Sequence, residues 1–231
     1  MLTPWVDAAA SLLLGSACPG CGTPTAQLCT SCAPVVGDPT PFAVVGTGVP
    51  VVAAGAYADV WQRCIVAYKE RGGWWLGAPL GRALALAVGG LLAGGIGLPG
   101  ELVLVPMPSQ PRSVRERGLD TTLLLARVAA RTLAASGLPT RVDPVLRHVR
   151  RVSDQSALGE HERRRNLVGA LSARVGLPGV RVVVDDLTTT GASLVEACRA
   201  LDGAGTPASG CAVVAATPLR RANGERTATI A

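Results

Sequence analysis

The alternation of short apolar strands with amphipathic helices is the feature that most constrains how this chain can fold. The predicted strands are 51–58, 101–108, 140–146, 170–175, 181–186 and 210–217, and the predicted helices are 58–73, 76–92, 119–137 and 193–205. Strands separated by helices form βαβ units, which build parallel sheets. Several of the strands are rich in valine, as expected of a sheet that is covered on both faces. We therefore predict an α/β domain with a mainly parallel sheet.

The length of 231 residues suits one such domain with a small appendage. We predict an N-terminal helix and four-cysteine module at 1–45, the α/β domain at 46–218 and a polar C-terminal tail at 219–231. Prolines and glycines punctuate residues 34–50, which predicts a linker between the module and the first strand.

Two apolar stretches have to be distinguished from targeting or membrane segments. Residues 1–18 lack a basic start and contain Asp7, which favours a short amphipathic helix over a signal peptide. Residues 83–100 are about long enough to cross a bilayer, but six glycines between Gly89 and Gly100 interrupt them. That pattern favours a buried helix followed by a glycine-rich loop. We expect a cytoplasmic protein without a membrane span.

Four cysteines near the N-terminus have the spacing of a metal site. Cys18/Cys21 and Cys29/Cys32 form two CxxC pairs that are separated by seven residues. Each CxxC turn can direct two thiolates at one ion, and four thiolates match the tetrahedral preference of zinc. Two disulfides are the alternative, which a cytoplasmic location disfavours. The cluster predicts a structural zinc. The other cysteines lack such spacing and are predicted core residues: Cys64, Cys198 and Cys211.

The net charge of +6 comes from one central stretch of the chain. Residues 112–165 hold twelve arginines and six acidic residues, whereas the remaining residues hold equal numbers of both signs. Such a surplus is expected of a surface that faces phosphate, although a solvated helical face would have the same composition.

The segment RVVVDDLTTTGAS (181–193) ends an apolar strand on two adjacent carboxylates, Asp185 and Asp186. It lacks the lysine of a Walker loop and the GxGxxG of a dinucleotide site. Carboxylates accept hydrogen bonds from vicinal hydroxyls, and a glycine-bearing loop at a helix N-terminus binds anions. That loop comprises Thr188, Thr189, Thr190, Gly191, Ala192 and Ser193. A sugar phosphate therefore fits this segment, although Ser193 and Glu196 could also form a capping box.

VVVDDLTTTGAS resembles the phosphoribosyl pyrophosphate motif of type I phosphoribosyltransferases. The four-cysteine module, YKERG, VPMPSQPRSVRERG and QSALGEHERRRNLVGA precede it in the order of the ComF competence family, which the chain resembles from about Cys18 to Thr217. Two positions depart from the family pattern. Residues 117–121 read RGLDT where relatives usually read RGFNQ, and Leu171 stands where relatives usually carry phenylalanine.

The resemblance implies a type I phosphoribosyltransferase fold behind a zinc-ribbon-like module. Asp185 and Asp186 would hold the ribose hydroxyls of phosphoribosyl pyrophosphate, bound with Mg²⁺, and residues 188–193 would hold its 5′-phosphate. The turn after strand 101–108 would contact pyrophosphate through Pro108, Ser109 and Arg112. A mobile loop would close over the pyrophosphate with three further residues: Arg150, Arg151 and Gln155.

The resemblance also implies a role in natural transformation, in which the protein handles incoming single-stranded DNA with a helicase-like partner. Two alternatives remain open, an active phosphoribosyltransferase of nucleotide salvage and a non-catalytic regulator gated by this ligand. Lys69 is either a phosphate contact or a solvated helix end. Trp74 and Trp75, which follow Arg71, are either stacking platforms for bases or the buried start of a helix.

Overall fold

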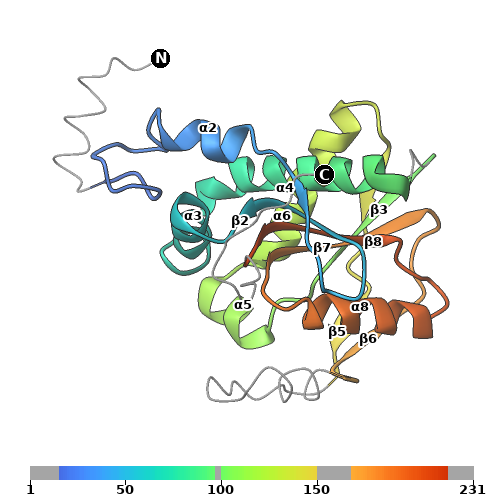
Figure 1. Ribbon diagram of the computed structural model, residues 1–231. Coiled ribbons are helices and arrows are strands. Elements are labelled where there is room, and N and C mark those ends of the chain that lie inside the picture. The colour runs from blue at the N-terminus through green and yellow to red at the C-terminus, as the bar shows by residue number, and fades with distance from the viewer. Residues whose placement is uncertain (1–15, 97–99, 150–167, 218–231) are drawn as a thin grey trace.

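The computed structural model describes residues 16–96, 100–149 and 168–217, which form an α/β structure (Figure 1). The main sheet has the strand order β1-β2-β8-β7-β3-β4. Its strands are β1 (Phe42–Ala43), β2 (Val51–Ala56), β3 (Leu102–Pro106), β4 (Thr140–Val142), β7 (Val180–Thr188) and β8 (Gly210–Ala216). Neighbouring strands pair in parallel except β1, which pairs antiparallel with β2. The mainly parallel sheet predicted from the sequence is confirmed.

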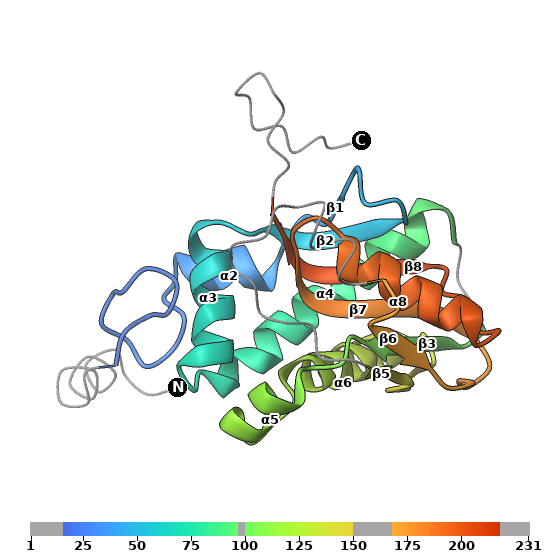
Figure 2. The same cartoon turned by 90° about the horizontal axis from the view of Figure 1, so that it is seen from below.

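Helices cover both faces of this sheet. One face carries α2 (Cys32–Gly37), α3 (Asp59–Glu70), α4 (Gly77–Leu91) and α6 (Thr121–Ala135). The other carries α8 (Ala192–Gly203) and a small antiparallel sheet of β5 (Leu146–His148) and β6 (Leu171–Ala173). Figure 1 shows α4 and α8 on opposite sides of the sheet, and Figure 2 views the sheet from the α8 side.

The valine run of β7 is explained by these two layers. Val182 and Val184 belong to the core beneath α4 and α6, while Val183 belongs to the core beneath α8. Successive side chains of a strand point to opposite faces, so a strand buried on both sides needs apolar residues at every position.

The strand order changes direction between β3 and β7. The chain passes from β3 to β4 on one side and from β7 to β8 on the other. In open α/β sheets, ligands bind at the carboxyl ends of the strands at such a switch point. The pairing of β7 with β3 ends at Val184, while its pairing with β8 continues to Thr188. The end of β7, which includes Asp185 and Asp186, therefore extends past β3.

The apolar stretch that was predicted to be a buried helix lies in the core. A 3₁₀ turn, η1 (Trp74–Leu76), leads into α4, and η2 (Leu92–Ile96) follows it. Among the described residues, Trp74–Ile96 is the one helical segment long and apolar enough to cross a membrane, and 61% of its most apolar window is buried. The contacts of α4 with β2, β8 and α6 are those of a core helix.

Two predicted irregular segments contain regular structure. The linker predicted at 34–50 was wrong in part, because it holds most of α2 and all of β1. Val36 of α2 is fully buried in the main core, so this segment belongs to the packed domain. The turn predicted after β3 contains a helix, α5 (Pro111–Arg117), which has no buried residue. Without a buried face, α5 leaves no apolar periodicity in the sequence.

The single strand predicted at 140–146 is divided between two sheets, with β4 in one and β5 in the other. Pro144 between them has no N–H to donate to a ladder. Asp143 is buried and accepts hydrogen bonds from the N–H of Leu177 at 2.8 Å and from Arg174 at 3.0 Å. These hydrogen bonds fix the bend between β4 and β5, where the apolar pattern of the sequence predicts one continuous strand.

Gly55 of β2 lies against the ring of the buried Trp61, where an added Cβ atom would overlap the ring. We expect Gly55→Ala to lower the free energy of unfolding by about 2 kcal/mol, because the ring must move within a packed core. Gly89→Ala in α4 is the matched control, since its Cβ would meet no atom within 4 Å. That change should raise the free energy of unfolding by about 0.5 kcal/mol. Urea unfolding measures both, and equal stabilities would contradict this packing.

Candidate functional site

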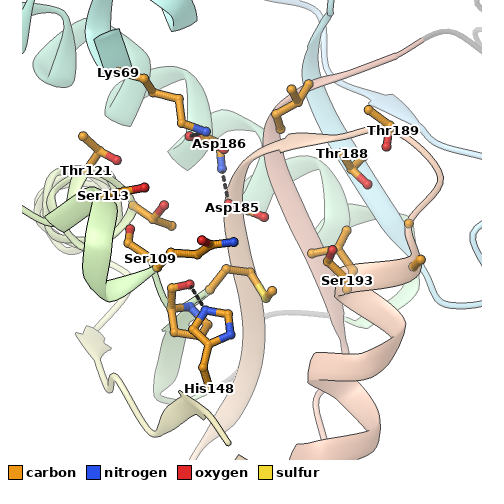
Figure 3. Close-up of a pocket in the computed structure, with 18 of the residues that line it drawn as sticks. Lys69, Ser109, Ser113, Thr121, His148, Asp185, Asp186, Thr188, Thr189 and Ser193 are labelled. Atoms are coloured by element: carbon orange, nitrogen blue, oxygen red, sulfur yellow. Dashed lines mark hydrogen bonds and ion pairs between the residues drawn. The ribbon is translucent and has the colours of Figure 1, made fainter. Parts of the chain in front are cut away.

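A cavity of about 480 Å³ lies at the switch point, at the carboxyl ends of β3 and β7 (Figure 3). Its walls come from the end of α3, the loop after β3 with α5, the start of α6, and the segment that joins β7 to α8. The residues that line it are Lys69, Met107, Pro108, Ser109, Gln110, Ser113, Arg117, Thr121, Thr122, His148 and 185–194. The cavity therefore brings together most of the site residues named from the sequence.

The two carboxylates at the end of β7 have different neighbours. The Asp186 carboxylate forms an ion pair with Nζ of Lys69 at 2.8 Å, whereas Asp185 lies farther from Lys69 (Figure 3). The backbone N–H of Asp186 donates a hydrogen bond to Oδ1 of Asp185 at 2.8 Å. One cation thus offsets part of the repulsion that two adjacent carboxylates would otherwise suffer.

Burial and charge set the ionisation of these groups. Burial, followed by the charge of Asp186, raises the pKa of Asp185 well above its ordinary value. Part of the Asp185 side chain is reached from the cavity, but protein atoms surround the rest. For Lys69, burial lowers the pKa, but the carboxylate of Asp186 outweighs burial and raises it. Lys69 therefore stays cationic, and a cation or hydrogen-bond donor in the cavity would favour the ionised form of Asp185.

The loop from Thr188 to Ser193 leads from β7 into α8 and closes one end of the cavity. Gly191 is the N-cap residue of α8 and has a left-handed backbone with φ of 76°. An added Cβ at Gly191 would lie 2.8 Å from side-chain atoms of Thr47, so packing as well as the backbone requires glycine. The first turn of a helix leaves N–H groups without helical partners, which makes this loop suitable for an anion.

The capping box considered for Ser193 and Glu196 was wrong. In the described structure no side chain caps α8, and Ser193 lines the cavity. Glu196 is buried and accepts hydrogen bonds from the N–H of Leu171 at 3.0 Å and from Nε of Arg199 at 2.7 Å. Burial raises the pKa of Glu196, but the bonds from Arg199 and the backbone outweigh it and lower the pKa. Glu196 thus ties α8 to β6.

Pro108 and Ser109, which follow β3, line the cavity opposite the end of β7. A ring nitrogen of His148, Nε2, is 2.9 Å from the carbonyl oxygen of Pro108, which fits an N–H donor on that nitrogen. Ser109 Oγ donates to Oδ1 of Asp120 at 2.8 Å, and Asp120 caps α6 by accepting from the N–H of Leu123. These hydrogen bonds connect the loop after β3 to β5 through His148 and to the start of α6 through Asp120.

Arg117 lies in the cavity wall, whereas Arg112 does not line it. The Arg112 side chain is 82% exposed and forms an ion pair with Glu116 one turn along α5. Arg117 donates from Nε to the carbonyl of Ser113 at 3.2 Å and from Nη1 to Oγ1 of Thr121 at 3.2 Å. The arginine of α5 that lines this cavity is therefore Arg117, five residues later in the chain than Arg112.

Several lining residues were missed by sequence reasoning: Gln110, Ser113, Arg117, Thr121, Thr122 and His148. A signal existed for Arg117, because it is the second arginine of the RERG motif at 115–118. No local pattern marks His148, whose partner is forty residues away. Arg150, Arg151 and Gln155 lie outside the described residues, as does the part of the basic stretch from 150 to 165.

The four N-terminal cysteines converge as their spacing predicted. Their sulfur atoms all lie within 4.8 Å of one another. Tetrahedral zinc with bonds of about 2.3 Å would hold its sulfurs roughly 3.8 Å apart, so small movements would complete the site. The N–H of Cys29 lies 3.4 Å from Sγ of Cys18, and Gly20 packs so closely that an added Cβ would lie 2.8 Å from Sγ of Cys32.

The module is attached to the domain through α3. Nη1 of Arg63 donates to the carbonyl oxygen of Gly20 at 2.9 Å, which joins α3 to the first CxxC turn. The other cysteines are buried core residues as predicted, with Sγ of Cys198 and Sγ of Cys211 3.7 Å apart. The donor set and geometry at the four-cysteine cluster fit a structural zinc with no open position.

No protein-family model and no curated protein matches this chain.

Metal analysis of the purified protein should find about one zinc per chain, because four thiolates at this spacing satisfy zinc fully. Cys21→Ser should lower the stoichiometry well below one, and Cys21 is exposed, so its loss opens no core cavity. Cys198→Ala is the control that removes a thiol outside the cluster and should leave the zinc content unchanged. Full zinc in the Cys21 variant would contradict four-cysteine coordination.

Proposed function

We propose that this chain binds phosphoribosyl pyrophosphate with Mg²⁺ in the cavity, on a type I phosphoribosyltransferase fold of the ComF kind. One observation carries the proposal. A carboxylate pair and a hydroxyl- and glycine-bearing helix start line one cavity at the switch point of the sheet. A sugar phosphate has hydroxyls for the first group and an anion for the second.

The ligand would extend along the end of β7. Carboxylate oxygens of Asp185 and Asp186 accept hydrogen bonds from the two ribose hydroxyls, each contributing about 1.5 to 3 kcal/mol. The 5′-phosphate lies in the loop from Thr188 to Ser193, where backbone N–H groups and hydroxyls bind it at the start of α8. The left-handed Gly191 lets the backbone approach the phosphate oxygens without a side chain in between.

The pyrophosphate would face the loop after β3 and α5. Ser109 and Gln110 belong to this wall, and Arg117 supplies a guanidinium there. Mg²⁺ would supply charge stabilisation for the pyrophosphate oxygens, with Asp185 and Asp186 as the carboxylates near it. Lys69 forms an ion pair with Asp186 and so offsets the charge of this buried carboxylate before the ligand binds.

The resemblance to the ComF family extends this proposal to the handling of incoming single-stranded DNA with a helicase-like partner. The described residues of the cavity would contact the sugar, the 5′-phosphate and the pyrophosphate of this ligand. None of them is assigned to an acceptor of the ribose phosphate, so the cavity supports ligand binding rather than a defined transfer reaction. We therefore propose ligand binding as the primary activity.

Calorimetric titration tests the carboxylate pair. Wild type should bind phosphoribosyl pyrophosphate in the presence of Mg²⁺, and Asp185→Asn/Asp186→Asn should weaken binding by roughly 100-fold through the loss of two charged acceptors. Asp202→Asn removes an exposed carboxylate from α8 outside the cavity and should bind like wild type. Equal affinity of the double variant and wild type would refute the assignment.

The assignment of Arg117 predicts a ligand-specific defect. Arg117→Gln should weaken binding of phosphoribosyl pyrophosphate and of pyrophosphate by about tenfold, while ribose 5-phosphate, which lacks the pyrophosphate, should bind within about twofold of wild type. Arg117→Lys should recover part of the loss because it keeps the charge. Arg112→Gln on the same helix is the control and should change none of these affinities. Equal losses for all three ligands would indicate a structural role for Arg117 instead.

A further inference from the structure

Cys198 of α8 and Cys211 of β8 form a pair of thiols in the core between α8 and the main sheet. Their sulfur atoms are 3.7 Å apart. A disulfide bond is about 2.05 Å long, so an approach of roughly 1.7 Å would bring the two sulfurs to bonding distance. Neither cysteine lines the cavity or belongs to the four-cysteine module. The chemistry of this pair is therefore separate from that of both sites.

The two thiols differ in their access to solvent and in their acidity. The exposed fraction is 9% for Cys198 and 0% for Cys211. The hydrogen bond that Cys211 can donate lowers the pKa of Cys198 and outweighs burial, which raises it. The same hydrogen bond, followed by burial, raises the pKa of Cys211 well above its ordinary value. Since a thiolate rather than a thiol attacks an oxidant, Cys198 is the nucleophile of the pair and Cys211 supplies the second thiol.

The main sheet holds Cys211 in place from both sides. Cys211 pairs in register with Val51 of β2 and with Val183 of β7, so β8 is an interior strand at this position. Cys198, in contrast, lies in a helix that covers the outside of the sheet. We therefore expect an approach of the two sulfurs to move α8 rather than β8.

A movement of α8 at Cys198 would reach the loop from Thr188 to Ser193. Leu194 lies one helical turn before Cys198, is buried in the same core and lines the cavity. At the helix start, Gly191 packs so closely against Thr47 that an added Cβ would lie 2.8 Å from its side chain. Such a contact tolerates little displacement, so a shift of α8 would loosen the loop.

We propose that Cys198 and Cys211 are a redox modification site, at which a hydroperoxide such as hydrogen peroxide forms a disulfide that loosens the start of α8. Disulfides in reducing compartments are usually transient and redox-sensing, and reduction by a thiol would restore the pair. The proposal goes beyond the binding of phosphoribosyl pyrophosphate and does not depend on it, because it concerns the loop before α8 whichever ligand that loop holds.

The oxidation takes two steps. The Cys198 thiolate attacks one oxygen of the peroxide, so that an S–O bond forms, the O–O bond breaks and hydroxide leaves. The product is a sulfenic acid at Cys198, and the proton released by its thiol converts the hydroxide to water. The Cys211 sulfur then attacks the Cys198 sulfur, so that an S–S bond forms, the S–O bond breaks and a second water leaves with the Cys211 proton. Two thiols are oxidised, and one peroxide is reduced to two waters.

Peptide mass spectrometry after treatment with hydrogen peroxide tests the disulfide. Trypsin cleaves after Arg199 and so separates the two cysteines, which places the disulfide between two different peptides. In the folded, zinc-loaded protein most chains should carry this link after treatment, and dithiothreitol should remove it. Cys64, which is 0% exposed, is the internal control and should remain open to alkylation after unfolding. Alkylation of Cys198 and Cys211 at the same level as Cys64 would overturn the proposal.

A variant without the second thiol separates the two steps. Cys211→Ala keeps Cys198 but removes its partner, so peroxide should leave a sulfenic acid at Cys198 that dimedone labels. Cys198→Ala should give neither the label nor the disulfide. A Cys211 variant that takes up no dimedone at Cys198 would contradict the role of Cys198 as the nucleophile.

Hydrogen exchange of the backbone amides tests the effect on α8 without any ligand. In oxidised wild type, exchange in residues 188–194 should be faster by about threefold or more, because local opening of the helix start becomes easier. Exchange in β3 should be unchanged. Peroxide should also leave residues 188–194 unchanged in Cys198→Ala, which retains every cysteine of the module. Full disulfide formation with unaltered exchange in residues 188–194 would refute the movement of α8.

Discussion

The ion pair between Lys69 and Asp186 is the interaction on which the cavity depends. Asp186 is almost fully buried beside a second carboxylate, and a buried charge without a partner is strongly unfavourable. Lys69 supplies that partner from α3, which is far from Asp186 in the sequence. The neighbouring Tyr68 is fully buried and donates to the carbonyl oxygen of Thr121 at 2.9 Å. The position of the cation is thus set by the burial of Tyr68 and by its hydrogen bond to the first residue of α6.

The opposite wall is fixed by contacts that take no part in ligand chemistry. Glu196 and Arg199 hold both backbone groups of Leu171, which joins α8 to β6. Thr47 packs against Gly191 at the start of the same helix. The loop that would meet a phosphate is therefore held in place before a ligand arrives, which reduces the entropy lost on binding.

The sequence was informative where structure is encoded by neighbouring residues. The valine-rich strands, the four cysteines and the acidic pair were all found because their signals lie within a few positions of one another. Arg117 was missed because α5 has no buried face, so no periodic pattern in the sequence shows which side of this segment faces the cavity. His148 was missed because its partner is distant in sequence. The exposure of Trp74 and Trp75 runs against the usual burial of aromatic residues, so their residue type alone did not predict it.

The helix α3 connects the cavity with the metal site proposed at the four-cysteine module. Through Lys69 it contacts the acidic pair, and through Arg63 it holds the four-cysteine module. A ligand that moved α3 in one site would alter the other, and the effect on the two binding free energies would be equal in both directions. The buried Tyr68 resists such a movement, because shifting it would break its hydrogen bond to Thr121 inside the core. The packing therefore argues for two sites that share a rigid wall and bind their ligands nearly independently.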